Sequence, residues 1–157
     1  MSKCRFCNTN LKYVFSDLGF SPPSNAFLNK EDLLSPEKYF PLKVQVCEKC
    51  YLVQINEFAK HNEIFNDNYA YFSSFSSSWL KHSKEYTQMM TKKLELNSNS
   101  LVIEIASNDG YLLQYFNQNN IPVLGIEPTA NTAKVAIKKG IPTKIDFFGK
   151  KLAKEIA

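Results

Sequence analysis

Four cysteines are the residues of this chain whose spacing points most directly to chemistry. They form two Cys-x-x-Cys pairs, Cys4 with Cys7 and Cys47 with Cys50, separated by residues 8–46. Two such turns can direct four thiolates at one ion, which predicts a tetrahedral, structural zinc site that closes the intervening loop. Because sulfur would fill every position, the metal would hold the fold and do no chemistry. A redox dithiol and disulfides are the alternatives, and the turn-rich surroundings and an expected reducing compartment disfavour them.

Acidic residues in the later part of the chain form the second group of chemical interest. Glu104 and Asp109 belong to one stretch that ends at Gly110, and Glu127 follows the apolar run 122–126. If the apolar runs are neighbouring parallel strands, these acids lie at the end of the sheet where open α/β sheets bind ligands. Glu127 could there accept hydrogen bonds from the two hydroxyls of a ribose.

The glycine content of this region decides between two kinds of nucleotide ligand. A dinucleotide needs several glycines so that its pyrophosphate can approach a helix N-terminus, whereas here only Gly110 is present and Asp109 stands at that terminus. S-Adenosylmethionine carries a sulfonium and an ammonium, so a mouth ringed by acids suits it electrostatically. Gly110 would then allow a close approach of the backbone. The alternative is that Glu104 and Asp109 only cap helices and that Glu127 is a surface acid.

Apolar periodicity predicts an α/β framework for these residues. Segments 42–47 and 51–55 read as strands beside the second cysteine pair and resemble a small zinc ribbon. Segment 18–27 is Pro-rich and predicts an ordered but irregular turn region. From residue 101 the order is strand, turn, helix, strand, helix, strand and the start of a helix, which predicts a doubly wound parallel sheet. The run 101–106 is apolar enough for a strand buried on both faces.

These patterns divide the chain into three regions. We expect a zinc-binding domain over 1–60, an aromatic and serine-rich segment with a linking helix over 61–97, and a partial Rossmann-like domain for S-adenosylmethionine over 98–157. The linking helix is expected over about 75–95, with serines supplying its N-cap. The aromatic residues before it are either core or a ligand-facing segment.

Composition and charge exclude several classes of protein. Of the 157 residues, 44% are hydrophobic and 22% charged, which excludes disorder as the main state. No apolar run is long enough to span a bilayer and no signal region follows the first residues, so we expect a cytoplasmic protein without membrane contact. The net charge of +4 arises in residues 129–157, where 7 lysines stand against 2 acids. We expect these lysines, Lys139 among them, to form a solvated helix face, and we expect no binding of nucleic acid.

Several segments together carry a family resemblance. They are the two cysteine pairs, Leu18-Gly-Phe-Ser-Pro-Pro-Ser-Asn-Ala-Phe27, Tyr69-Ala-Tyr-Phe-Ser-Ser74, Glu104-Ile-Ala-Ser-Asn-Asp-Gly110 and Gly125-Ile-Glu-Pro128. In this order they resemble the zinc-containing C-methyltransferases of nucleotide-linked deoxysugars. The resemblance implies an enzyme that uses S-adenosylmethionine to methylate carbon 3 of a dTDP-linked keto sugar, which the zinc domain and a later domain help to enclose. Ala106 departs from the family, which more often has glycine there, and its methyl group could crowd the cofactor.

The expected site draws on the aromatic segment and on the ends of the strands. Tyr69 and Tyr71 are the candidate catalytic residues, since a phenol can position the sugar or donate a hydrogen bond to an enolate oxygen. The expected contacts to S-adenosylmethionine are Tyr71, Phe72, Ser74, Glu104, Ala106, Ser107, Asn108, Asp109, Gly110, Leu113, Glu127, Pro128, Asp146 and Phe147. His61 and His82 lie in no matching motif, and the resemblance implies that a histidine acid-base pair comes from a later segment.

The expected sheet is incomplete, because a methyltransferase of this kind needs further strands after the third. We therefore expect this chain to be the N-terminal part of the enzyme, to need the missing C-terminal half and to be inactive alone. Two other classes stay open: a zinc-ribbon interaction module without catalysis, and a nucleotide-sugar dehydratase or epimerase with a nicotinamide cofactor. Oxygen or nitrogen as the methyl acceptor also stays open, and the sequence does not specify an oligomeric state.

Overall fold

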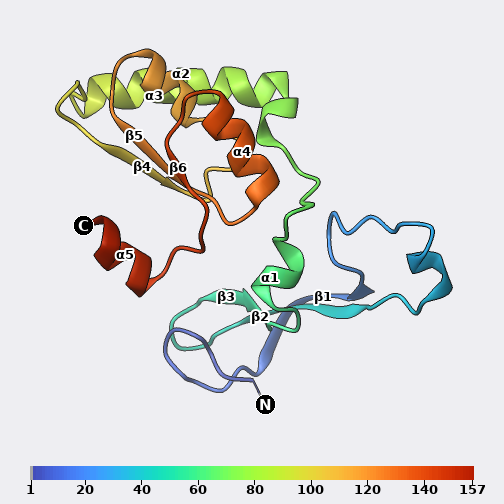
Figure 1. The fold of residues 1–157 in the computed structure, drawn as a ribbon. Helices are drawn as coiled ribbons and strands as arrows, with labels where there is room; N and C mark the ends of the chain where they lie inside the picture. Colours follow the sequence, from blue (N-terminus) through green and yellow to red (C-terminus); the bar gives the residue numbers. More distant parts are fainter. Residues whose placement is uncertain (1) are drawn as a thin grey trace. The chain divides into compact units, whose positions relative to one another are not determined.

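The computed structural model describes residues 2–157 and divides them into two compact units. The first unit ends at Ile64 and the second spans Phe65–Ala157 (Figure 1). No helix in the described part of the chain is both long and apolar enough to cross a membrane.

The first unit is built on a three-stranded antiparallel sheet with the strand order β1-β2-β3. Its elements are β1 (Tyr13–Ser21), the 3-10 helix η1 (Asp32–Leu34), β2 (Phe40–Val46), β3 (Val53–Ile55) and α1 (His61–Ile64). The two strands expected beside the second cysteine pair are confirmed as β2 and β3. The buried apolar cluster of this unit consists of Cys4, Leu11 and Cys47. The cysteines therefore take the place of a hydrophobic core.

Strand β1 corrects the expected turn region, which was to begin at residue 18. The strand continues to Ser21, which pairs with Phe40 of β2. The register shifts between Asp17 and Phe20, and Gly19 within this shift has a φ of +75° and donates its N–H to the Asp17 carboxylate at 3.0 Å. The register shift is a bulge, and the bulge accommodates the positive φ of Gly19 within the strand. The same bulge breaks the regular alternation by which a strand is recognised in a sequence.

The second unit combines a long helix with a parallel three-stranded sheet and its connecting helices. Its elements are η2 (Ser73–Phe75), α2 (Ser77–Lys93), β4 (Val102–Ile105), α3 (Leu113–Gln118), β5 (Val123–Ile126), α4 (Ala130–Lys138), β6 (Thr143–Lys144) and α5 (Lys150–Ile156). The strands pair in parallel in the order β4-β5-β6 (Figure 1). This confirms the α/β class and a partial Rossmann-like sheet. The expected serine cap of the linking helix is also confirmed, because Ser76 accepts the N–H of Trp79 at 3.2 Å.

The core of the second unit lies against one face of the sheet. Its buried residues come from the helices, strand β5 and the connecting loops: Leu113, Phe116, Ile121, Val123, Ala136 and Ile141. Val102 of β4 packs against this cluster, whereas Ile103 and Ile105, which point to the opposite face, are 42% and 53% exposed. The expectation that this strand is buried on both faces is therefore wrong for the described residues. The reason is that the core residues of α3 and α4 gather in one cluster on a single face.

Candidate functional site

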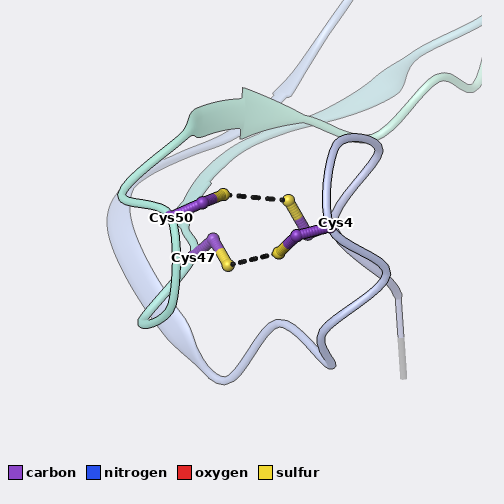
Figure 2. Close-up of side chains that lie close together, drawn as sticks. Cys4, Cys47 and Cys50 are labelled. Atoms are coloured by element: carbon purple, nitrogen blue, oxygen red, sulfur yellow. Dashed lines mark hydrogen bonds between the residues drawn. The ribbon is translucent and has the colours of Figure 1, made fainter.

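The four cysteines of the first unit lie together as one potential metal centre. Their sulfur atoms all lie within 4.8 Å of one another. The Sγ atoms of Cys4 and Cys50 are 3.6 Å apart (Figure 2). Those of Cys7 and Cys47 are 3.5 Å apart. Sulfurs on a tetrahedral zinc ion, each about 2.3 Å from the metal, are roughly 3.8 Å apart, whereas disulfide sulfurs are about 2.05 Å apart. The donor set and its spacing fit zinc, and the prediction that both pairs form one site is confirmed.

Each cysteine pair lies in a backbone turn of its own, and the two turns have the same geometry. The N–H of Asn8 donates to the Cys4 carbonyl, and the N–H of Tyr51 donates to the Cys47 carbonyl, both at 2.9 Å. Asn8 and Tyr51 each follow the second cysteine of their pair, and each has a positive φ, 58° and 60° respectively. The repeated turn explains how two segments far apart in the sequence present their sulfurs to a common centre.

Gln54 of β3 orients one of the sulfurs and was not recognised in the sequence. Its buried side chain donates to the Sγ of Cys4 at 3.3 Å and accepts the N–H of Arg5 at 3.0 Å. Hydrogen bonds to the Cys4 sulfur lower the pKa of this thiol to about 6. The largest contribution comes from the backbone N–H of Cys7, and the second largest from the side chain of Gln54. A lowered pKa favours the thiolate that binds a metal, and an outer hydrogen bond of this kind fixes the ligand's orientation.

The second unit contains a cavity of about 420 Å³ at the carboxyl ends of its strands. It is lined by Phe65, Tyr69, Tyr71, Ser73, Ile105, Ala106, Asn108, Tyr111, Ile126, Glu127, Pro128, Asp146, Phe147 and Phe148. Glu127 and Asp146 are the charged members of this lining, and both are negative. A largely apolar cavity with converging polar groups, placed at strand ends, is where a parallel α/β sheet binds a small ligand.

Part of the predicted site lies in the lining of the cavity. Of the residues expected to bind or react, those in the lining are Tyr69, Tyr71, Ala106, Asn108, Glu127, Pro128, Asp146 and Phe147. Those outside the lining are Phe72, Ser74, Glu104, Ser107, Asp109, Gly110 and Leu113. Leu113 is fully buried in the core of the unit. Six lining residues were not selected from the sequence: Phe65, Ser73, Ile105, Tyr111, Ile126 and Phe148. Ser73, Ile105 and Ile126 stand inside the motifs that carry the family resemblance, and Tyr111 and Phe148 are next to selected residues, whereas no signal pointed to Phe65.

Glu127 is held in place by its own chain. Its Oε2 accepts the N–H of Asn108 at 2.8 Å, and its Oε1 accepts the N–H of Thr129 at 2.9 Å together with the Thr129 hydroxyl. The residue is only 4% exposed, yet it lines the cavity. A carboxylate offers about four lone-pair sites, so these three hydrogen bonds leave room for a ligand hydroxyl.

Asp109 is paired with a lysine and does not reach the cavity. The Nζ of Lys139 lies 3.5 Å from the Asp109 Oδ2 and donates to the Asp109 carbonyl oxygen at 2.9 Å. Asp109 is 2% exposed, so the ammonium compensates a buried carboxylate. This arrangement corrects one expectation, since Asp109 does not ring the mouth of the cavity. Lys139 is exposed, as expected, and its ammonium also pairs with Asp109.

Glu104 of β4 is the acid whose protonation the fold changes most. Burial raises the pKa of its carboxyl to about 8; the Tyr111 hydroxyl opposes this shift, and the charges of Glu127 and Asp109 add to it. Its Oε2 is buried and has no hydrogen-bond partner among the described residues. Glu104 is therefore largely protonated at neutral pH and does not supply the negative charge expected of it there. A cation brought close to it would favour the ionised form.

Three residues in the loop after β4 are left-handed, and two of them, Gly110 and Ala106, have this conformation for different reasons. Gly110 has a φ of +76°, and a Cβ there would lie 2.4 Å from the Cδ1 of Ile141. Packing within the unit therefore requires this glycine, whereas a close approach of the ligand was expected to require it. Ala106 has a φ of +60° and lines the cavity. Its conformation is strained for alanine and natural for glycine, which is the residue that the family resemblance favours at this position.

Comparisons with known proteins support the assignment of both parts of the chain. Residues 4–65, which include all four cysteines, match a family model described as "Putative zinc binding domain". The whole chain is 29% identical over 157 residues to the C-methyltransferase NovU of Streptomyces niveus. The chain is similar to a C-methyltransferase over its whole length and spans 37% of the length of that protein. These findings confirm the resemblance of the chain to part of a zinc-containing C-methyltransferase.

Proposed function

We propose that the cavity of the second unit binds S-adenosylmethionine and that the chain is the zinc-binding and donor-binding part of a C-methyltransferase. The observation that carries the proposal is the cavity at the strand ends, whose charged lining residues are Glu127 and Asp146. Negative lining attracts a ligand that carries a sulfonium and an ammonium. Glu127 lines the cavity and has room on its carboxylate to accept a hydrogen bond from a ribose hydroxyl. When bound, S-adenosylmethionine supplies a methyl group on positively charged sulfur.

We propose a nucleotide-linked keto-deoxysugar, such as a dTDP-linked one, as the methyl acceptor. This rests on the family resemblance, and the name of the similar protein specifies carbon as the acceptor atom. A carbon beside a ketone becomes nucleophilic when a base removes its proton, and the resulting enolate oxygen needs a hydrogen-bond donor. Tyr69 and Tyr71 line the same cavity as Glu127. Their phenols can donate to such an oxygen, whereas the phenol of Tyr111, which also lines the cavity, is hydrogen-bonded to Glu104.

The general base is not among the candidates in this cavity. His61 and His82 are absent from the described lining, and Glu127 is occupied by hydrogen bonds that fix its orientation. As the family resemblance implies, we propose that the base is a histidine of a later segment of the enzyme. The role that the chain can perform by itself is to bind the donor and to present the two phenols.

Calorimetric titration of the 157-residue chain with S-adenosylmethionine tests this proposal. We expect saturable binding that weakens by about tenfold, or 1.4 kcal/mol, in Glu127→Gln, and a smaller loss in Asp146→Asn, whose exposed side chain bears less on folding. Glu95→Gln is the control, because Glu95 is an exposed residue outside the cavity lining. S-Adenosylhomocysteine, which lacks the positive sulfur, should bind more weakly. No heat with the wild-type chain, or heat with NAD⁺ alone, would overturn the proposal.

A further inference from the structure

Residues 69–74 contribute three residues to the lining of the cavity, and we call this segment the tyrosine wall. Tyr69, Tyr71 and Ser73 line the cavity, whereas the intervening Ala70 and Phe72 do not. Tyr69 and Tyr71 alternate as in an extended chain, and Ser73 begins the 3-10 helix η2 that follows. The backbone of the wall therefore decides where both phenols stand.

Two asparagines hold the backbone of the tyrosine wall. The side-chain amide of Asn131, at the start of α4, donates to the Tyr69 carbonyl at 2.7 Å. The side chain of Asn108, in the loop after β4, donates to the Tyr71 carbonyl at 3.1 Å and accepts the N–H of Ser73 at 2.9 Å. The backbone groups of three alternate residues of the wall are thus fixed by side chains from two other elements.

A lysine provides a third attachment at the end of the wall. Lys139 donates to the Ser74 hydroxyl at 3.1 Å with the same ammonium that pairs with the buried Asp109. The wall is consequently bonded to the loop after β4, to the start of α4 and to the residue that follows α4. Hydrogen bonds from three separate elements give a segment outside the sheet a single position.

Asn108 differs from the other two attachments because it also contacts the proposed donor site. Its backbone N–H donates to the Oε2 of Glu127 at 2.8 Å, while its side chain holds Tyr71 and Ser73. Asn108 is 7% exposed and has a φ of 50°, a conformation that asparagine adopts more readily than most residues. One residue therefore joins the carboxylate of the donor site to the wall that carries the phenols.

We infer that Asn108 is a positioning residue that fixes the tyrosine wall relative to the donor site, with Asn131 and Lys139 as supporting contacts. The functional meaning of this role rests on the proposed function, because the phenols are the groups expected to face the methyl acceptor. Asn108 itself acts through the backbone of Tyr71 and Ser73. Asn108 was expected to contact the donor and lines the cavity, and the hydrogen bonds of its side chain to the wall add a second role.

Asn108→Gly separates the two connections made by this residue. Glycine adopts a φ of 50° without strain and keeps the N–H that donates to Glu127, but it lacks both side-chain hydrogen bonds. Asn120→Gly is the matched control, since Asn120 also has a positive φ, 57°, and is exposed outside the cavity lining. Asn131→Ala removes the attachment at Tyr69 alone and places a stronger helix former in α4.

The tyrosine ring signals of ¹³C-labelled protein and the exchange rate of the Ser73 amide proton report on the wall by NMR. In Asn108→Gly we expect Ser73 to exchange about tenfold faster or more and the Tyr69 and Tyr71 rings to move toward the shifts of free tyrosine. The methyl signals of Leu113, in the core, should not change. Asn131→Ala should perturb Tyr69 more than Tyr71, and Asn120→Gly should resemble the wild type.

Calorimetry with S-adenosylmethionine completes the test. We expect Asn108→Gly to weaken donor binding less than Glu127→Gln does, because glycine keeps the backbone N–H that donates to Glu127. Unchanged Ser73 exchange in Asn108→Gly would overturn the positioning role, and so would loss of the Leu113 signals or a loss of donor affinity of tenfold or more. Absence of donor binding to the wild-type chain would refute the proposed function, while the Ser73 and tyrosine signals would still decide whether Asn108 fixes the wall.

Discussion

Replacing Glu104 with glutamine should make the stability of the second unit less sensitive to pH. Burial raises the pKa of Glu104 from 4.5 to about 8 in the folded unit. A carboxyl group with a raised pKa gives its full contribution to stability below about pH 4.5, and that contribution is lost as the pH rises to about 8. Glutamine has nearly the same shape and cannot ionise. The wild-type unit should therefore lose stability over this pH range relative to Glu104→Gln.

The size of the effect follows from the two pKa values. One pKa unit corresponds to about 1.36 kcal/mol. Between pH 4.5 and pH 7 the carboxyl group ionises in the unfolded chain and stays largely protonated in the folded unit, so the wild type loses on the order of 3 kcal/mol from this group. Any fixed difference between a carboxyl and an amide in the buried site is independent of pH and cancels when the two pH values are compared.

Urea unfolding followed by tryptophan fluorescence measures this effect in the second unit alone, because the single tryptophan of the chain, Trp79, lies in α2. We expect the unfolding free energy of Glu104→Gln relative to wild type to increase by about 3 kcal/mol from pH 4.5 to pH 7. Glu95→Gln, at an exposed position after α2, should show no such increase. Parallel pH profiles for wild type and Glu104→Gln would refute the conclusion that the folded unit keeps Glu104 protonated.

Three further perturbations test the metal centre and the loop after β4. Chelation of zinc, or Cys47→Ser, should unfold the first unit, because cysteines form most of the buried cluster of that unit, and should leave the Trp79 signal of the second unit unchanged. A first unit that circular dichroism shows to be folded and metal analysis shows to be free of metal would contradict this. Gly110→Ala should lower the stability of the second unit by about 2–4 kcal/mol in urea unfolding, because the new Cβ would overlap the Cδ1 of Ile141 and because alanine is strained at the positive φ of this position. A loss below about 0.5 kcal/mol would show that the loop adapts. Ala106→Gly should stabilise the second unit by up to about 1 kcal/mol by removing left-handed strain, and it should bind S-adenosylmethionine at least as tightly by calorimetry; lower stability would disprove the strain.

Much of the framework could be predicted from local patterns. The cysteine spacing identified the metal centre, because one backbone turn repeated twice is enough to bring four sulfurs together. The parallel order of β4, β5 and β6 followed from apolar runs that alternate with helical segments. No part of strand β1 was predicted, and from residue 18 onward a turn region was expected in its place, because two register shifts, one of them at Gly19, interrupt the alternation on which the prediction of a strand depends.

The details of the cavity depend on contacts between residues far apart in the sequence. The hydrogen bond from Asn131 to Tyr69 joins residues that no local pattern connects. Asp109 was predicted to act on a ligand from its place in a motif, but its partner Lys139 lies 30 residues later in the chain. Motifs identified which loops meet at the strand ends, whereas the tertiary packing decides which side chains of those loops face the cavity.

The most direct test of the central claim is to map S-adenosylmethionine on the chain by NMR. Backbone amide signals would be followed during a titration of the zinc-loaded 157-residue protein. The account predicts that the largest shifts fall on the cavity loops, at Ala106, Asn108, Glu127 and Phe147, while the cysteine turns of the first unit stay unchanged. Saturable shifts elsewhere in the chain, or none at these four residues at millimolar donor, would contradict it.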